Sequence, residues 1–258
     1  MPLTFAHPAA VLPLLRGPLV PAALVAGALA PDVPYFLRGL QVPVSAQSWW
    51  EPFMNATTTH DWPDAATISL PTALLLYLAI TACVRPFRWL IALTGPTPRR
   101  PARVPAWWGW MVLSLIVGVV THVVWDSFTH SEGWVVQNVA FLNEHAAGSL
   151  TWARLLQHLS TAVGLAAIAV YSWRRRGQWF PASRGGRRLT RRAAIVGLAA
   201  AILGAVAVVV VRDGLASGVE HVLASAAVGA GLGAATAVVA FSLVWWVTRP
   251  DKERPRPS

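Results

Sequence analysis

The chain has 258 residues, of which 55% are hydrophobic and only 12% are charged, and its formal net charge is +10. Soluble domains carry about a quarter charged residues, so this composition excludes an ordinary soluble globular protein and predicts an integral membrane protein. The single cysteine, Cys83, excludes a disulfide framework and a cysteine-based zinc site. The positive charge is concentrated in three segments that adjoin apolar runs, which argues against a nucleic-acid partner.

The first apolar stretch, residues 18–30, lies between Arg16 and Asp32 and is too short for an easy membrane crossing. Extension toward the N-terminus gives enough length, but the extended segment includes Arg16, His7 and four prolines. The segment either spans the membrane obliquely or enters from the outer face as a re-entrant element, and both alternatives remain open. A secretory signal peptide is not expected, because the segment lacks a basic start and its apolar run ends in Pro31-Asp32.

Five longer apolar runs follow, and each reaches the roughly 20 residues that a helix needs to cross about 30 Å of hydrocarbon. Because irregular backbone cannot face lipid, these runs predict an all-α, polytopic bundle of five or six transmembrane helices. The last run is rich in glycine and alanine, which predicts close packing against a neighbouring helix. The runs are residues 66–84, 107–126, 155–173, 193–211 and 220–247.

Most of the 21 lysines and arginines lie in residues 85–103, 174–192 and 249–256. These segments fall on one side of the membrane if the five helices alternate in direction. The positive-inside rule predicts that this side, with the C-terminus, is cytoplasmic. The same arginines suit contact with the anionic headgroups of the bilayer.

Several histidines and aspartates fall at the predicted outer ends of the helices. In the segment from Thr121 to His130, His122, Asp126 and His130 recur every four residues and share one face if the helix continues. Imidazole and carboxylate groups are ligands for zinc and related divalent ions. Ionisable groups within a membrane helix are costly and usually functional. The pattern predicts a metal site whose candidate ligands are Asp32, His60, His122, Asp126, His130 and His158, joined by His7 if the N-terminal segment does not cross.

These residues also have a purely structural interpretation. His122 would then be hydrogen-bonded within the bundle, and Asp126 would be exposed at the headgroups. Asp61 would cap the following helix, and His158 would hydrogen-bond across the bundle. In this case the cluster only stabilises helix ends.

The opening sequence from Met1 to Leu14 resembles the start of an uncharacterised family of bacterial integral membrane proteins. Segments 30–35, 121–134 and 156–160 fit the same family, and the similarity covers most of residues 1–175. More distantly, the order His, Pro-Asp, His-Ser, His-x-x-x-Asp is similar to that of inner-membrane proteins described as metal-dependent hydrolases. The same order resembles the zinc-dependent phospholipase C and single-strand nuclease superfamily, whose members are all-helical.

The resemblance implies a divalent metal, with zinc the expected ion, in a multi-pass protein of the bacterial plasma membrane. Two departures from the superfamily pattern are visible: His60 is followed by Asp61 rather than serine, and the Gln-Pro-Leu-His that follows the aspartate in the nucleases is absent. The ligands that the comparison implies are His7, Asp32, His60, His122 and Asp126, with His130 or His158 completing a second ion.

The charge pattern and the extent of the resemblance divide the chain into four parts. The first part carries the candidate metal site, and the two helices of the third part carry none of its residues. The parts are a membrane domain at 1–175, an Arg-rich cytoplasmic linker at 176–192, two further transmembrane helices at 193–247 and a basic cytoplasmic tail at 248–258.

Two functions remain open. The first is a membrane-embedded, metal-dependent hydrolase that acts on a phosphoester at the outer leaflet, with a phospholipid among the candidate substrates. In this function Asp61 or Asp64 would be a catalytic general base or would orient a metal ligand. The second is a non-enzymatic membrane protein, such as a carrier, a metal-binding module or a partner subunit, whose His/Asp cluster is structural.

Overall fold

The computed structural model describes residues 4–38, 45, 47–61, 63–90, 104–179, 184–212 and 218–248. Helices dominate this part of the chain, and its strands are the short antiparallel pair β1 (His145–Ala147) and β2 (Leu150–Thr151). The described residues form two compact units. The first contains the residues up to Leu78 and those of 104–176, and the second contains residues 79–90 and those from 177 onward. The prediction of an all-α protein is confirmed.

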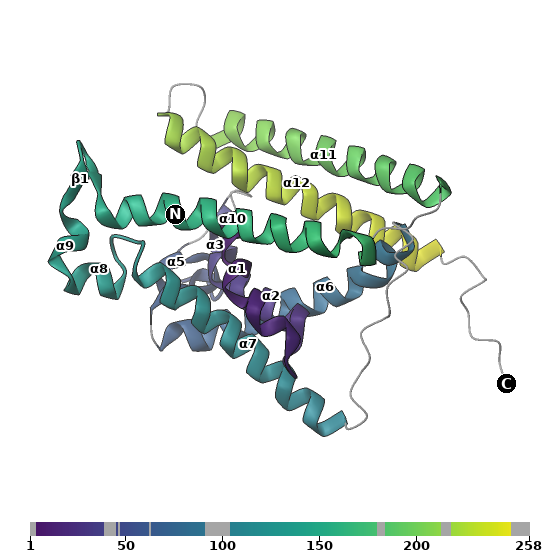
Figure 1. Ribbon diagram of the computed structural model, residues 1–258, viewed down its shortest axis with the longest axis horizontal. Helices are drawn as coiled ribbons and strands as arrows, with labels where there is room; N and C mark the ends of the chain where they lie inside the picture. Colours follow the sequence, from purple (N-terminus) through teal and green to yellow (C-terminus); the bar gives the residue numbers. More distant parts are fainter. Residues whose placement is uncertain are drawn as a thin grey trace. The chain divides into compact units, whose positions relative to one another are not determined.

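Five helices among the described residues are long and apolar enough to cross a membrane (Figure 1). Their side chains are mostly exposed: only 6% of the most apolar window of the fourth helix is buried, and Leu203 in it is 70% exposed. Such surfaces are stable in lipid rather than in water, so the chain is a polytopic membrane protein, as predicted. The helices are α6 (Leu70–Leu90), α7 (Val104–Ser127), α10 (Trp152–Trp179), α11 (Arg184–Arg212) and α12 (Val219–Thr248).

The N-terminal segment is a chain of short helices. Its longest α-helix, α2, has nine residues, and the apolar helical stretch Pro21–Leu37 that contains it is shorter than the roughly 20 residues that a helix needs to cross the hydrocarbon. The segment also returns to its starting level, because Nε2 of His7 lies 3.9 Å from Oδ2 of Asp32. This path, which leaves one level and returns to it, is that of a re-entrant element rather than of a membrane span; the entry of the element into a membrane stays a prediction. The helices are η1 (Thr4–Ala6), α1 (Pro8–Val11), η2 (Leu12–Arg16), α2 (Pro21–Leu29), η3 (Ala30–Asp32) and α3 (Val33–Arg38).

Helix α2 packs along α7, and the two lie side by side in Figure 1. Gly27 and Gly118 form the crossing: a Cβ on Gly27 would clash with the carbonyl oxygen of Leu115, and one on Gly118 would clash with that of Leu24. Below the crossing, the backbone N–H of Val20 donates to Oγ of Ser114, 2.8 Å away. The two glycines let the backbones approach closely enough for polar groups of one helix to reach the other.

The segment between the re-entrant element and α6 is tied to both. It contains α4 (Glu51–Met54), α5 (Ala56–His60) and a π-helical turn, η4 (Ala65–Ser69). Oγ1 of Thr59 donates to the carbonyl of Pro31 over 2.7 Å, and Oγ of Ser69 donates to the carbonyl of Thr59 over 3.0 Å. These buried bonds hold the C-terminal end of α5 against η3.

Helices α8 (Trp134–Asn138) and α9 (Ala140–Asn143), followed by the β1–β2 hairpin, connect α7 to α10. Val136, Leu142 and Ala153 form a small buried cluster under this connection. Gly148 adopts a φ of +56° in the turn between the strands, a conformation that glycine reaches without steric cost.

In the second unit, α11 packs closely against α12. A Cβ on Gly204 would clash with the carbonyl oxygen of Gly229, and one on Gly233 would clash with that of Ala200. The predicted close packing of the glycine-rich last run is thereby confirmed.

Candidate metal centre

Four segments that are distant in the sequence bring imidazole and carboxylate groups to one place in the first unit. His7 precedes α1, Asp32 ends η3, His60 ends α5, and His122 and Asp126 lie one turn apart near the end of α7. The exposed fractions of His7, Asp32 and His122 are 1%, and that of Asp126 is 3%. This concentration of buried ionisable groups needs a physical explanation, because an unpaired buried charge is costly.

The ligand atoms of Asp32, His60, His122 and Asp126 all lie within 4.8 Å of one another. The Nε2 atoms of His60 and His122 are 3.2 Å apart. Oδ2 of Asp126 is 3.3 Å from both nitrogens, and Oδ1 of Asp32 is 3.5 Å from both. A tetrahedral zinc ion with bonds of about 2.0–2.1 Å places its ligand atoms about 3.3–3.4 Å apart. The spacing of the four groups therefore fits a single tetrahedral ion.

Backbone carbonyls set the tautomers of two of these histidines. Nδ1 of His122 lies 2.7 Å from the carbonyl oxygen of Ala28, and Nδ1 of His60 lies 2.7 Å from that of Ala56. A carbonyl oxygen only accepts, so each Nδ1 carries the donated proton and each neutral ring presents a lone pair at Nε2. Two lone pairs that face each other across 3.2 Å repel unless a cation or proton lies between them. Metal-binding histidines are usually oriented by such a second hydrogen bond.

His7 and His130 offer further donors beside the four central groups. Nε2 of His7 lies 3.5 Å from Oδ1 of Asp126, and its ring stacks on that of His122 with centroids 3.8 Å apart. Nε2 of His130 lies 3.3 Å from Oδ2 of Asp126. Each carboxylate thus presents one oxygen to the His60–His122 pair. Its other oxygen, Oδ2 in Asp32 and Oδ1 in Asp126, is the one paired with His7. Carboxylates placed in this way can bridge two metal ions.

The donor atoms of the cluster lack other partners. The following atoms are buried and have no hydrogen-bond partner among the described residues: both ring nitrogens of His7, both carboxylate oxygens of Asp32 and of Asp126, and Nε2 of His130. A buried polar group left unsatisfied costs about 1–3 kcal/mol, and native structures contain few such groups. A bound cation would satisfy these atoms together, so the residues present fit a divalent metal.

The environment also sets the protonation of the ligands outside the membrane spans. Burial, reinforced by the neighbouring His122, lowers the pKa of His7 to about 4. The ring of His7 is therefore neutral at pH 7 and able to bind a metal. Burial acts in the same direction on His60, but the carboxylates of Asp126 and Asp32 outweigh it and raise the pKa of His60 to about 9 without metal. Burial opposes ionisation of Asp32, yet His122 and His60 hold the pKa of that carboxyl well below its usual range.

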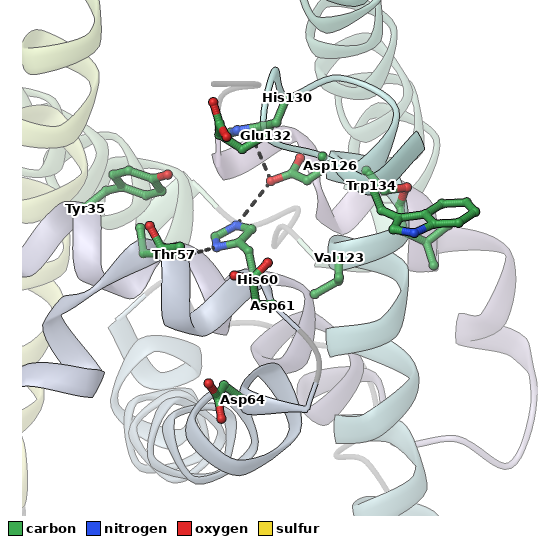
Figure 2. A pocket seen from close by; sticks show the side chains of 14 residues that line it. Tyr35, Thr57, His60, Asp61, Asp64, Val123, Asp126, His130, Glu132 and Trp134 are labelled. Atoms are coloured by element: carbon green, nitrogen blue, oxygen red, sulfur yellow. Dashed lines mark hydrogen bonds and ion pairs between the residues drawn. The ribbon is translucent and has the colours of Figure 1, made fainter. Parts of the chain in front are cut away.

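A cavity of about 740 Å³ opens onto one side of the cluster. Figure 2 shows His60 and His130 turned toward Asp126, and these three residues line the cavity. His7, Asp32 and His122 are not among its lining residues and lie behind it. The centre is thus buried on one side and accessible on the other, as catalytic metal sites require. Other residues of the lining are Tyr35, Thr57, Asp61, Asp64, Glu132 and Trp134.

The remaining predicted site residues lie elsewhere. His158 is exposed on α10 and is not among the described residues of the cluster. Asp61 and Asp64 are exposed and line the cavity without belonging to the four-residue ligand group. Asp61 directly follows α5, and Asp64 precedes η4 without a side-chain capping bond. Their role as catalytic groups stays a prediction.

The carbonyl partners Ala28 and Ala56 and the cavity residues Tyr35, Glu132 and Trp134 were not predicted from the sequence. Two features of the sequence mark this neighbourhood. Gly118 precedes His122 by one helical turn, and Glu132 follows His130 by two residues. The carbonyl partners had no such signal, because backbone acceptors are present at every position.

A family model described as a domain of unknown function (DUF4184) matches residues 1–243. No curated protein and no solved structure is significantly similar to the chain. The match includes the metal cluster and continues through α11 into α12, so the glycines that line this helix pair lie within the matched residues. The family description assigns no activity.

Proposed function

The chain belongs to this family of unknown function, and we propose that it is a membrane-embedded, metal-dependent hydrolase of phosphoesters. One observation carries the proposal. The Nε2 atoms of His60 and His122 face each other across 3.2 Å beside two buried carboxylates, and His60 and Asp126 of this group line an open cavity. When bound there, a divalent ion supplies an activated water and polarises a phosphoryl oxygen. Zinc suits the mixed nitrogen and oxygen donors and the tetrahedral spacing.

In this reaction the chain's own residues would orient the metal ligands and accept the proton of the attacking water. Water attacks phosphorus, the bond from phosphorus to the ester oxygen breaks, and the proton lost by the water is returned to the departing alcohol. Asp61 and Asp64 line the cavity, and the exposed carboxylate of one of them would accept that proton or orient a ligand. The hydrogen bonds of His60 and His122 to carbonyls keep both rings fixed throughout.

The location of the centre supports a substrate from the lipid surface. His122 and Asp126 lie at the C-terminal end of α7, opposite the end that follows the arginine-containing segment 85–103. Under the positive-inside rule this end faces outward from a bacterial plasma membrane whose cytoplasmic side holds the C-terminus. The cavity would then lie near the phospholipid headgroups, which makes a phospholipid a reasonable substrate.

Metal content tests the proposal first. Detergent-purified wild type should contain one or two equivalents of zinc by elemental analysis, and His122→Ala and Asp126→Ala should each lose it. His158→Ala is the matched control, because it removes an exposed histidine outside the cluster and should retain the metal. A well-folded wild type without stoichiometric metal would overturn the proposal. Metal-loaded protein should then hydrolyse at least one member of a panel of phosphomonoesters and phosphodiesters.

A second candidate function has its own supporting observation. Four protein donors at tetrahedral spacing also describe a closed structural metal site. In that case the protein is a metal-binding module, carrier or partner subunit without hydrolytic activity. Tight metal binding without turnover of any phosphoester in the panel would favour this function.

A further inference from the structure

The cavity over the metal centre has acidic walls. Its lining residues include Asp61, Asp64 and Glu132 and no lysine or arginine within the described part of the chain. All three carboxylates belong to exposed residues. Figure 2 shows Glu132 on the Asp126 side of the His60–Asp126 pair, and Asp61 and Asp64 on the His60 side. The walls therefore form a negatively charged surround for whatever binds at the centre.

A second observation, independent of these walls, indicates a ligand at the floor. Asp126 is 3% exposed and lines the cavity, and neither of its carboxylate oxygens has a hydrogen-bond partner among the described residues. A buried acceptor without a partner at the base of an open cavity is satisfied by a bound group. The cavity is thus a ligand site rather than a hollow between helices.

The buried carboxylates of the centre and the exposed carboxylates of the cavity walls need separate positive charges to compensate them. A divalent ion compensates the two buried carboxylates of Asp32 and Asp126 and can then accept a phosphoryl oxygen. It leaves the three wall carboxylates uncompensated. A phosphomonoester dianion or a nucleic-acid strand would bring more negative charge toward these walls, which disfavours both by like-charge repulsion.

A cationic substituent reverses this interaction. An ammonium group attached a few atoms from the phosphate would face the carboxylates while the phosphate occupies the metal centre. Aromatic rings of Tyr35 and Trp134 line the same cavity, and ring faces attract ammonium groups. The volume of about 740 Å³ accommodates a group of this size.

We propose that this cavity selects a phosphoester that carries an amine or quaternary ammonium group, through Asp61, Asp64 and Glu132 and the flanking rings. The proposal rests on the hydrolase function above and names its substrate class. It excludes phosphomonoesters without a positive charge and polyanions as preferred substrates.

Two isosteric probes test the charge preference directly. Choline phosphate and 3,3-dimethylbutyl phosphate have the same shape, and carbon replaces the charged nitrogen in the second. Calorimetric titration of the full-length, zinc-loaded protein should show about tenfold tighter binding of choline phosphate. Glu132→Gln and Asp64→Asn should each reduce this preference. Glu144→Gln is the matched control, because it removes an exposed carboxylate that is not among the lining residues, and it should leave the preference intact.

Equal affinity for the two probes, or no measurable binding of either, would overturn the charge preference. So would a preference that survives both cavity variants, as expected if the acidic walls only attract metal ions toward the centre. Turnover of the nitrophenyl diesters of the same two phosphates separates this proposal from the hydrolase function. Hydrolysis of both at equal efficiency supports the hydrolase and overturns the charge preference, whereas hydrolysis of neither overturns the hydrolase.

Discussion

At the scale of single residues, the metal centre depends on which nitrogen of each histidine carries a proton. The carbonyls of Ala28 and Ala56 cannot donate, so they fix Nδ1–H on His122 and His60 and leave Nε2 directed at the carboxylates. His7 differs, because both of its nitrogens are buried without a partner among the described residues. The ring of His7 is held by stacking on His122 instead, which leaves either nitrogen available to a metal.

Proton release on metal binding is a prediction at this scale. Without metal, the neighbouring carboxylates overcome burial and raise the pKa of His60 to about 9, so its ring is protonated at pH 7. Metal must displace that proton, and the apparent affinity for zinc should therefore rise with pH until the pH reaches about 9. Calorimetric titrations of metal-free protein in buffers of different ionisation enthalpy should show close to one proton released per zinc at pH 7. Binding enthalpies that do not depend on the buffer would contradict this assignment.

At the scale of helices, the centre depends on the crossing of α2 and α7. Gly118 lies one turn before His122, and Gly27 directly precedes Ala28, whose carbonyl accepts from His122. The close approach at the two glycines thus brings the carbonyl to the imidazole. Gly118→Ala should destabilise the protein by about 1–3 kcal/mol and reduce its zinc content, because the added Cβ would clash with the backbone of α2.

Gly109→Ala is the control for this substitution, since it lies on the same helix with no atom within 4 Å of the added Cβ. Thermal unfolding and elemental analysis of both variants check the prediction. If Gly118→Ala bound zinc as well as Gly109→Ala, the crossing would not be what positions His122.

The α11–α12 pair gives a matching prediction in the second unit. Gly204→Ala should lower the thermal stability of the protein, because its Cβ would clash with the carbonyl oxygen of Gly229. Gly197→Ala, where the added Cβ meets nothing within 4 Å, should not. Zinc content should stay at the wild-type level in both variants, since the described metal ligands belong to the first unit. Loss of zinc from Gly204→Ala alone would show that the helix pair supports the centre.

The sequence was sufficient for the long helices and for part of the site. Apolar runs of about 20 residues have one stable solution in lipid, and i, i+4 spacing places His122 and Asp126 on one face. The sequence could not determine the path of the N-terminal segment, because an apolar stretch of intermediate length suits either a tilted span or a re-entrant element. The sequence also could not show that His158 is exposed, because the face that α10 presents to its neighbours depends on tertiary packing.

At the scale of the whole molecule, the distribution of lysines and arginines predicts the orientation of the protein in the membrane, and labelling of introduced cysteines tests it. In a variant that carries Cys83→Ser, a cysteine introduced as Glu144→Cys should react with a membrane-impermeant maleimide in intact cells. One introduced as Ser258→Cys should react only after lysis. Labelling of the tail in intact cells would invert the assigned orientation and place the metal centre on the cytoplasmic side.

The re-entrant N-terminal segment has a consequence for biosynthesis. The groups that His7 faces on α7 are synthesised more than a hundred residues after it. Helix α2 is too short to span the bilayer alone, and its close partner, the surface around Gly118, does not exist until α7 has been inserted. During synthesis this segment therefore lacks its partner on α7 until that helix has been made. The proposed metal could then load only after α7 has been made, because a chain arrested before α7 would lack His122 and Asp126.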